Sequence, residues 1–181
     1  PIHQLIRNYY TDYGLNELDQ RKLIIRDLVK LGMNINLPMK YKMNNGEFIL
    51  KESALHNLFL VTSQHQARHD NNILQIIDLL ANLKFNFSYT QKDTTSPLVA
   101  SNALGFRNKT FRHKVIQKLV DRGFNLNLKD FLGKTILFKN YFLEKYPDTV
   151  NFLISLGADY KIRDKNANTL LHYANKDNSP V

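Results

Sequence analysis

The sequence predicts an all-α fold, a solenoid of stacked helical pairs, because two short phrases recur along the chain. The first phrase follows an apolar run, and its second residue is glycine in three copies and lysine in one. Its copies begin at Leu31, Leu83, Arg122 and Leu156. The second places Ser or Thr before apolar residues, and its copies begin at Ser53, Ser96, Thr135 and Thr169. The last two of these are 34 residues apart. Self-similarity at such a period is typical of repeat architectures.

Each copy of the second phrase is interpreted as the start of a first helix. A Ser or Thr hydroxyl at an N-cap accepts a hydrogen bond from a free backbone N–H of the first turn. Pro97 follows Ser96 directly, and proline fits the first helical position because no N–H is needed there. A truncated copy, Pro1-Ile2-His3, opens the chain. We therefore expect about four to five helix-turn-helix units.

The first phrase marks the end of each second helix. Second helices are predicted at Lys22–Leu31, Ile73–Asn82, Lys114–Arg122 and Thr149–Leu156, each with apolar residues at helical spacing. Gly32, Gly123 and Gly157 follow three of them, where a left-handed residue is favoured. Lys84 takes this place in the second copy, which predicts a strained or altered turn. Such helices bury their apolar stripe only against neighbouring units, so several units are needed for stability.

A long insertion lies in the second unit, from Leu37 to Glu52. It contains Asn45-Gly46 between two short stretches of extended character, which is a strong hairpin signal. Long insertions project from solenoids and often reach a partner. The alternatives are an elongated hairpin without a special partner and, as a further hypothesis, an enzymatic site of unfamiliar type.

The composition limits the classes of function. The chain has 181 residues and no cysteine, which excludes disulfides and thiolate metal sites. Its net charge of +9 makes a polyanion partner a candidate. No apolar run approaches the roughly 18 residues that span a bilayer, and no catalytic motif is found. We expect an intracellular, non-enzymatic protein without cofactor or metal, and the first residue, Pro1, suggests an excised or processed piece.

The chain resembles the ankyrin repeat family over almost its entire length. The best match runs from Asp130–Phe138 through Leu153–Asp159, and Asp164–Ala174 is nearly as good. The resemblance implies a single ankyrin-repeat domain over 1–181, with units at approximately 1–36, 37–87, 88–127, 128–161 and a partial 162–181. Proline and histidine of the family pattern are replaced in several copies. This divergence is similar to ankyrin proteins of intracellular bacteria and poxviruses, which implies an effector acting on host proteins in the host cytoplasm.

The resemblance implies a protein–protein interaction module. Ankyrin proteins usually bind partners through their hairpin tips and the concave face of their first helices. The corresponding positions here are Lys92, Asp93, Phe131, Leu132, Lys134, Phe142, Lys165 and Asn166. Phe131 and Leu132 stand out because large apolar residues exposed at a tip can anchor an interface. Alternatively, both pack against a neighbouring loop.

A basic run supports a different function, binding of nucleic acid or anionic lipid. Its candidate anion-binding residues are Arg112, Lys114, Lys118 and Arg122. The last three are spaced four residues apart, so they share one helix face and could contact successive phosphate groups. The solvated outer face of a solenoid helix explains the same pattern.

Several polar residues have mainly structural interpretations. His65 and His69, followed by Asp70, have metal-ligand spacing, but they lie near the link between helices and lack the Glu of a His-Glu-x-x-His arrangement, so no metal site is expected. His172, like His3 and His56, occupies the histidine position of the family pattern, which implies a hydrogen bond within a turn. Asn36 and Asn127 match the family's final Asn, which a host dioxygenase hydroxylates in some members, and a loop-stabilising amide is the favoured alternative.

Overall fold

A computed structural model describes residues 15–36, 39–42, 48–52, 70–88, 108–130, 132–138 and 147–176. The chain divides into two compact units, Pro1–Tyr89 and Thr90–Val181, called unit 1 and unit 2 below. The division falls close to the expected boundary between the second and third repeats, at 87 and 88. A single repeat domain over the whole chain stays a prediction.

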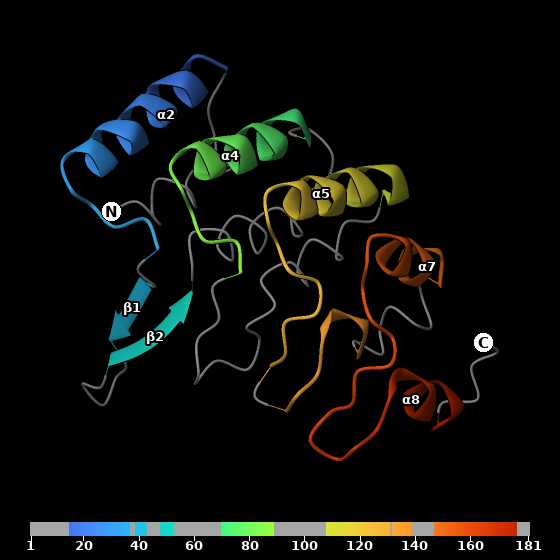
Figure 1. Ribbon diagram of the computed structural model, residues 1–181. Helices are drawn as coiled ribbons and strands as arrows, with labels where there is room; N and C mark the ends of the chain where they lie inside the picture. The colour runs from blue at the N-terminus through green and yellow to red at the C-terminus, as the bar shows by residue number, and fades with distance from the viewer. Residues whose placement is uncertain are drawn as a thin grey trace. The chain divides into compact units, whose positions relative to one another are not determined.

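Unit 1 contains two helices, α2 (Leu15–Lys30) and α4 (Asp70–Asn82), which lie side by side (Figure 1). Both end where the sequence predicts, within a residue, but α2 begins well before the expected Lys22. Lys22 Nζ donates a hydrogen bond to Gln75 Oε1, which joins the two helices at their surface. Ile25 of α2 and Ile76 of α4 are both buried, as expected for the apolar stripes of amphipathic helices.

The insertion forms the expected antiparallel hairpin. Strand β1 (Met39–Lys42) pairs with β2 (Phe48–Glu52), with Lys40 opposite Leu50 and Lys42 opposite Phe48. The predicted turn at Asn45-Gly46 lies outside the described residues. These two strands form the only sheet in the described part of the chain, which is otherwise helical, consistent with the all-α expectation (Figure 1).

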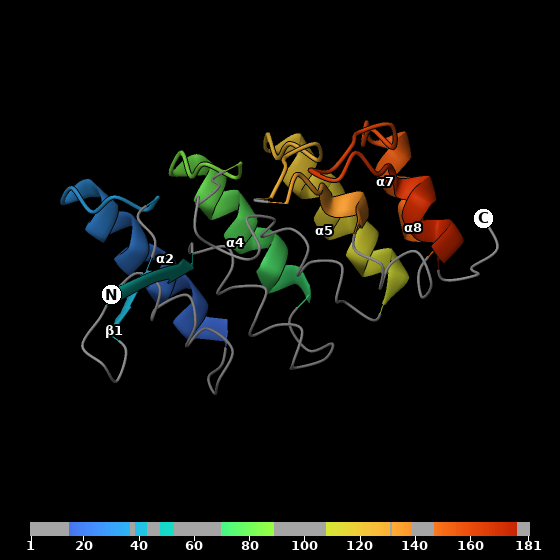
Figure 2. The same ribbon diagram turned by 90° about the horizontal axis from the view of Figure 1, so that it is seen from below.

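Unit 2 contains α5 (Lys109–Asp121), the 3₁₀ turn η4 (Ile136–Phe138), α7 (Pro147–Ser155) and α8 (Leu170–Lys176). Helices α5 and α7 are neighbours in both views (Figures 1 and 2). Helix α5 begins five residues before the predicted Lys114. Its N-cap is Asn108, whose side-chain Oδ1 accepts a hydrogen bond of 2.9 Å from the backbone N–H of Phe111.

The four second helices end in the same way. After α5, the N–H of Phe124 donates to Leu119 O and the N–H of Gly123 donates to Val120 O, both at 2.9 Å. This pair of bonds defines a Schellman cap, and it recurs after α2, α4 and α7. The cap residues Gly32, Gly123 and Gly157 have φ between +90° and +97°, and Lys84 adopts φ +57°. Of the two alternatives predicted at Lys84, the structure supports the strained turn, because its φ is positive while its cap hydrogen bonds match those of the other three helices.

Each unit has its own buried apolar residues. In unit 1 they are Ile25, Ile35, Ile73, Ile76, Ile77, Leu79, Leu80, Phe85 and Phe87. In unit 2 they are Phe111, Val115, Ile116, Leu119, Phe124, Leu126, Ile136, Leu137, Phe138, Val150, Leu153, Ala158 and Leu170. Many come from the phrases that repeat along the sequence, so the repeated pattern is the pattern of the core.

Candidate functional site

The first candidate hairpin runs from Asp130 to Lys134 and is closed by its own hydrogen bonds. The N–H of Asp130 donates to Lys134 O, and the N–H of Gly133 donates to Asp130 O, both at 2.9 Å. Asp130 Oδ1 accepts from the N–H groups of Leu132 and Lys134, at 2.9 and 2.8 Å. Gly133 has φ +78°, and a Cβ there would lie 3.0 Å from the backbone N of Lys165. Glycine is therefore favoured at this position by its conformation and by the close approach of the neighbouring loop.

A second hairpin repeats this construction 34 residues later, from Asp164 to Asn168. Asp164 Oδ1 accepts from the N–H groups of Asn166 and Asn168, each at 2.9 Å. The N–H of Asp164 donates to Asn168 O at 2.9 Å. Ala167 replaces the glycine of the first hairpin and still adopts φ +63°. The two tips thus share one hydrogen-bond pattern, built on a carboxylate at the same position.

The two hairpins are joined to each other and to α8. The N–H of Lys165 donates to Leu132 O at 2.9 Å, as between neighbouring strands. Tyr173 of α8 donates from its hydroxyl to Asp164 Oδ2 at 2.6 Å, and Lys134 Nζ lies 4.4 Å from its ring centroid. The bond from Tyr173, assisted by the N–H donors of the hairpin, lowers the pKa of Asp164. The tips are therefore held as one preorganised element.

The structure brings together four of the predicted partner-binding residues. Leu132 is 43% exposed at the first tip, and Lys165 and Asn166 are exposed at the second. Lys134 is half-buried beneath them, against the Tyr173 ring. The remaining candidates, Lys92, Asp93, Phe131 and Phe142, lie outside the described residues. A binding role for these positions stays a prediction.

Asn127 links successive loops, as expected of a loop-stabilising amide. Its Nδ2 donates to Gly157 O at 3.0 Å, and its Oδ1 accepts from the N–H of Asp159 at 2.7 Å. In unit 1, Asn36 Oδ1 accepts from the N–H of Asn86 at 2.7 Å. Both side chains thus satisfy backbone groups of the following repeat, which accounts for asparagine at these positions in structural terms.

His172 is confirmed as a hydrogen-bonding residue of a turn. Its Nδ1 accepts from the N–H of Thr169 at 3.1 Å and lies 2.9 Å from the Thr169 hydroxyl. The other two histidines of the pattern, His3 and His56, lie outside the described residues. One repeat earlier, Phe138 stands in the place of His172. The corresponding hydroxyl, Thr135 Oγ1, is buried without a hydrogen-bond partner among the described residues.

The anion-binding set on α5 requires a correction at Arg112. Its side chain is buried, with 1% of its surface exposed, and its Nε donates to Thr149 Oγ1 on α7 at 3.0 Å. This hydrogen bond places Arg112 on the face of α5 that packs against α7. Lys114 and Arg122 are exposed and Lys118 is half-buried. The possible anion-binding stripe is therefore reduced to these three residues.

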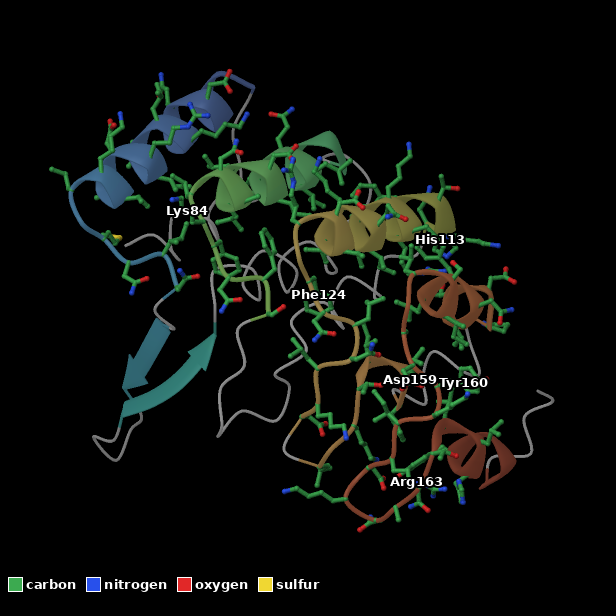
Figure 3. All side chains as sticks on the ribbon, viewed as in Figure 1. Lys84, His113, Phe124, Asp159, Tyr160 and Arg163 are labelled. Atoms are coloured by element: carbon green, nitrogen blue, oxygen red, sulfur yellow. The ribbon has the colours of Figure 1, made fainter. Side chains whose placement is uncertain are left out.

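His113 sits at the same contact between α5 and α7, a feature that sequence reasoning missed. Figure 3 shows it on the side of α5 toward α7, where its ring stacks on Phe152 with centroids 4.0 Å apart. Burial lowers the pKa of His113, the charges of Arg112 and Lys109 lower it further, and Asp148 opposes them. In the sequence His113 belongs to a basic run, and no local signal distinguishes a packed imidazole from a solvated one.

The described residues contain no cluster of three or more His, Asp or Glu suited to a metal ion. The pair His65 and His69 lies outside them. No helix within the described ranges is long and apolar enough to cross a bilayer.

Comparison with known proteins gives a partial likeness. No family model matches the chain. A protein of Acanthamoeba polyphaga mimivirus, named as an ankyrin repeat protein, is 35% identical over 66 residues. The match covers 36% of this chain and 9% of the relative, so the chain spans only a small part of that protein's length. The likeness supports ankyrin-like repeats, whereas the number of repeats and their extent over the chain stay predictions.

Proposed function

We propose that this chain is a protein-binding module of the ankyrin type. It docks a partner protein through its hairpin tips and through the face of its first helices. The observation that carries the proposal is the exposed Leu132, held at the apex of a hairpin whose backbone is closed by its own hydrogen bonds. Large apolar side chains that are exposed on a rigid element are typical anchors of protein interfaces.

Preorganisation of the tips supports this role. The carboxylates of Asp130 and Asp164 satisfy the N–H groups of the two tips, and the bond from Lys165 to Leu132 fixes one tip against the other. Binding therefore orders little additional backbone, which lowers its entropic cost. The side chains of Leu132, Lys165 and Asn166 are left exposed for contact with a partner.

In this proposal the chain catalyses no reaction, and its partner is a protein of the host cell. Recognition by stacked repeats requires neither cofactor nor catalytic residue. The relative from a mimivirus and the divergent repeat pattern support a host protein in the cytoplasm of an infected cell as the partner. The partner would then be found in eukaryotic cell lysate.

Capture from such a lysate tests the proposal. The chain is compared with Leu132→Ala and with Leu171→Ala, a matched control because Leu171 is an exposed leucine on α8, outside the hairpins. We expect the hairpin variant to retain its thermal unfolding transition and to lose capture of a specific protein by about tenfold or more. The control variant should retain capture. Equal capture by both variants would remove the hairpins from the binding surface.

Polyanion binding is the second candidate function, favoured by the exposed Lys114 and Arg122 on α5 and the net charge of +9. Its test is the salt dependence of binding to double-stranded DNA and to vesicles containing anionic lipid. Neutralising about three phosphates would give a steep loss of affinity with rising salt concentration. Absence of binding at low salt would eliminate this candidate.

A further inference from the structure

The two hairpins and the residues directly before them carry three exposed cations and one exposed leucine. Lys129 lies at the base of the first hairpin, next to Asp130, and Lys165 lies in the second, within a backbone hydrogen bond of Leu132. Arg163 directly precedes the second hairpin and is also exposed (Figure 3). We call Lys129, Leu132, Arg163 and Lys165 the hairpin face. Its exposed side chains combine three positive charges with one leucine.

The carboxylates adjacent to these cations in the sequence accept hydrogen bonds within the fold. Asp130 holds two backbone N–H groups of the first hairpin. Asp164 is buried and holds two N–H groups of the second hairpin and the hydroxyl of Tyr173. Arg163 Nη1 donates to Ala167 O at 2.6 Å, a neutral acceptor. Within the described part of the chain, Lys129 and Lys165 form no ion pair.

This arrangement selects for a particular chemistry in the ligand. Cations of one sign fixed on a rigid surface raise the local concentration of anionic partners and steer their approach. The exposed side chain of Leu132 gains free energy only when an apolar group covers it. The combination favours a polypeptide with acidic residues flanking an apolar one.

We propose that the hairpin face binds an acidic segment of the partner protein, with one apolar side chain of that segment on Leu132. Carboxylates of the segment pair with Lys129, Arg163 and Lys165. This inference rests on the proposed protein-binding function and adds the chemistry of the partner. Because the two tips are held together by the bond from Lys165 to Leu132, the spacing between the cations and Leu132 is set before the segment binds.

The test uses the full chain and fluorescently labelled peptides. The probe peptide carries Glu residues on both sides of a Leu-Phe pair, and the control peptide replaces every Glu by Gln. We expect the Glu peptide to bind at least about tenfold more tightly than the Gln peptide, and its binding to weaken with salt. Replacing Lys129 and Lys165 by Gln should remove this difference, and Leu132→Ala should weaken both peptides.

A variant of equal charge change separates the hairpin face from net charge. Lys114→Gln together with Lys118→Gln alters α5 by the same two charges and should leave peptide binding unchanged. Equal loss in this variant, or equal affinity for the Glu and Gln peptides, would overturn the proposal. A single-stranded oligonucleotide that competes through the hairpin face and binds more tightly than the Glu peptide would also overturn it. If lysate capture depends on Leu132 while the Glu peptide fails, only the partner chemistry falls and the binding function stands.

Discussion

The hydroxyl of Tyr173 donates a 2.6 Å hydrogen bond to Oδ2 of Asp164, which ties helix α8 to the base of the second hairpin. The same carboxylate uses Oδ1 to hold the N–H groups of Asn166 and Asn168. Asp164 thus connects the shape of the tip to the position of the last described helix. A change at Asp164 would therefore affect both the second hairpin and the position of α8.

Replacing Tyr173 by Phe should loosen α8 and lower the melting temperature by several degrees. The hydrogen bond from Tyr173 lowers the pKa of Asp164, so the folded carboxyl ionises more readily than the unfolded one. This contribution to stability is present above the ordinary pKa and is lost as the pH falls through the folded pKa. Thermal unfolding in acid should therefore separate the two proteins less than at neutral pH. An identical difference at both pH values would contradict this linkage.

Replacing Ala167 by Gly should stabilise the second hairpin. Ala167 adopts φ +63°, a conformation in which a Cβ is strained and glycine is not. We expect the free energy of unfolding to rise by about 0.5–1 kcal/mol, measured by urea denaturation. Gly133→Ala is the reverse control and should destabilise, since its Cβ would lie 3.0 Å from Lys165 N. Destabilisation by both substitutions would show that backbone strain does not limit these tips.

Replacing Thr135 by Val should leave stability unchanged or raise it by about 1 kcal/mol, because the substitution removes, at nearly constant volume, a buried hydroxyl that has no partner among the described residues. Thr169→Val provides the comparison at the same position of the next repeat. It removes a hydroxyl that lies 2.9 Å from His172 Nδ1, and should destabilise. Equal losses in the two variants, measured by chemical denaturation, would mean that Thr135 has an acceptor after all.

His113 should make the contact between α5 and α7 sensitive to mild acid. Its pKa is lowered in the folded state by burial and by the charges of Arg112 and Lys109. Between the folded pKa and the ordinary value, the unfolded state binds more protons, so stability falls as the pH falls through this window. His113→Gln should reduce this loss, measured by urea denaturation at about pH 7.5 and about pH 5. An unchanged loss in the variant would assign it to other groups.

Local chemistry made the helix ends predictable. Schellman caps depend on a residue that tolerates positive φ, so Gly32, Gly123 and Gly157 mark their turns directly. Lys84 was recognisable because it breaks this rule within an otherwise regular phrase. The paired strands β1 and β2 followed from an Asn-Gly signal flanked by extended stretches, which is also a local feature.

Helix starts and side-chain surroundings were less predictable. Helix α5 begins at Lys109 because Asn108 caps it, but the basic run that follows resembled a solvated surface. The buried side chain of Arg112 is hydrogen-bonded to Thr149, which is 37 residues away in the sequence. No local sequence pattern predicts a contact over that distance. Pairing between the hairpins, from Lys165 to Leu132, likewise arises only when the repeats stack. For the candidate site, the sequence could therefore propose the tip residues but not how they are held together.

Hydrogen–deuterium exchange of the chain alone and in complex with its captured partner measures the binding surface directly. Protection on binding should appear in the two hairpins, 129–134 and 163–168, and should be lost together with binding in Leu132→Ala. Protection confined to α5, or unchanged exchange in the hairpins of a saturated complex, would contradict recognition through the tips.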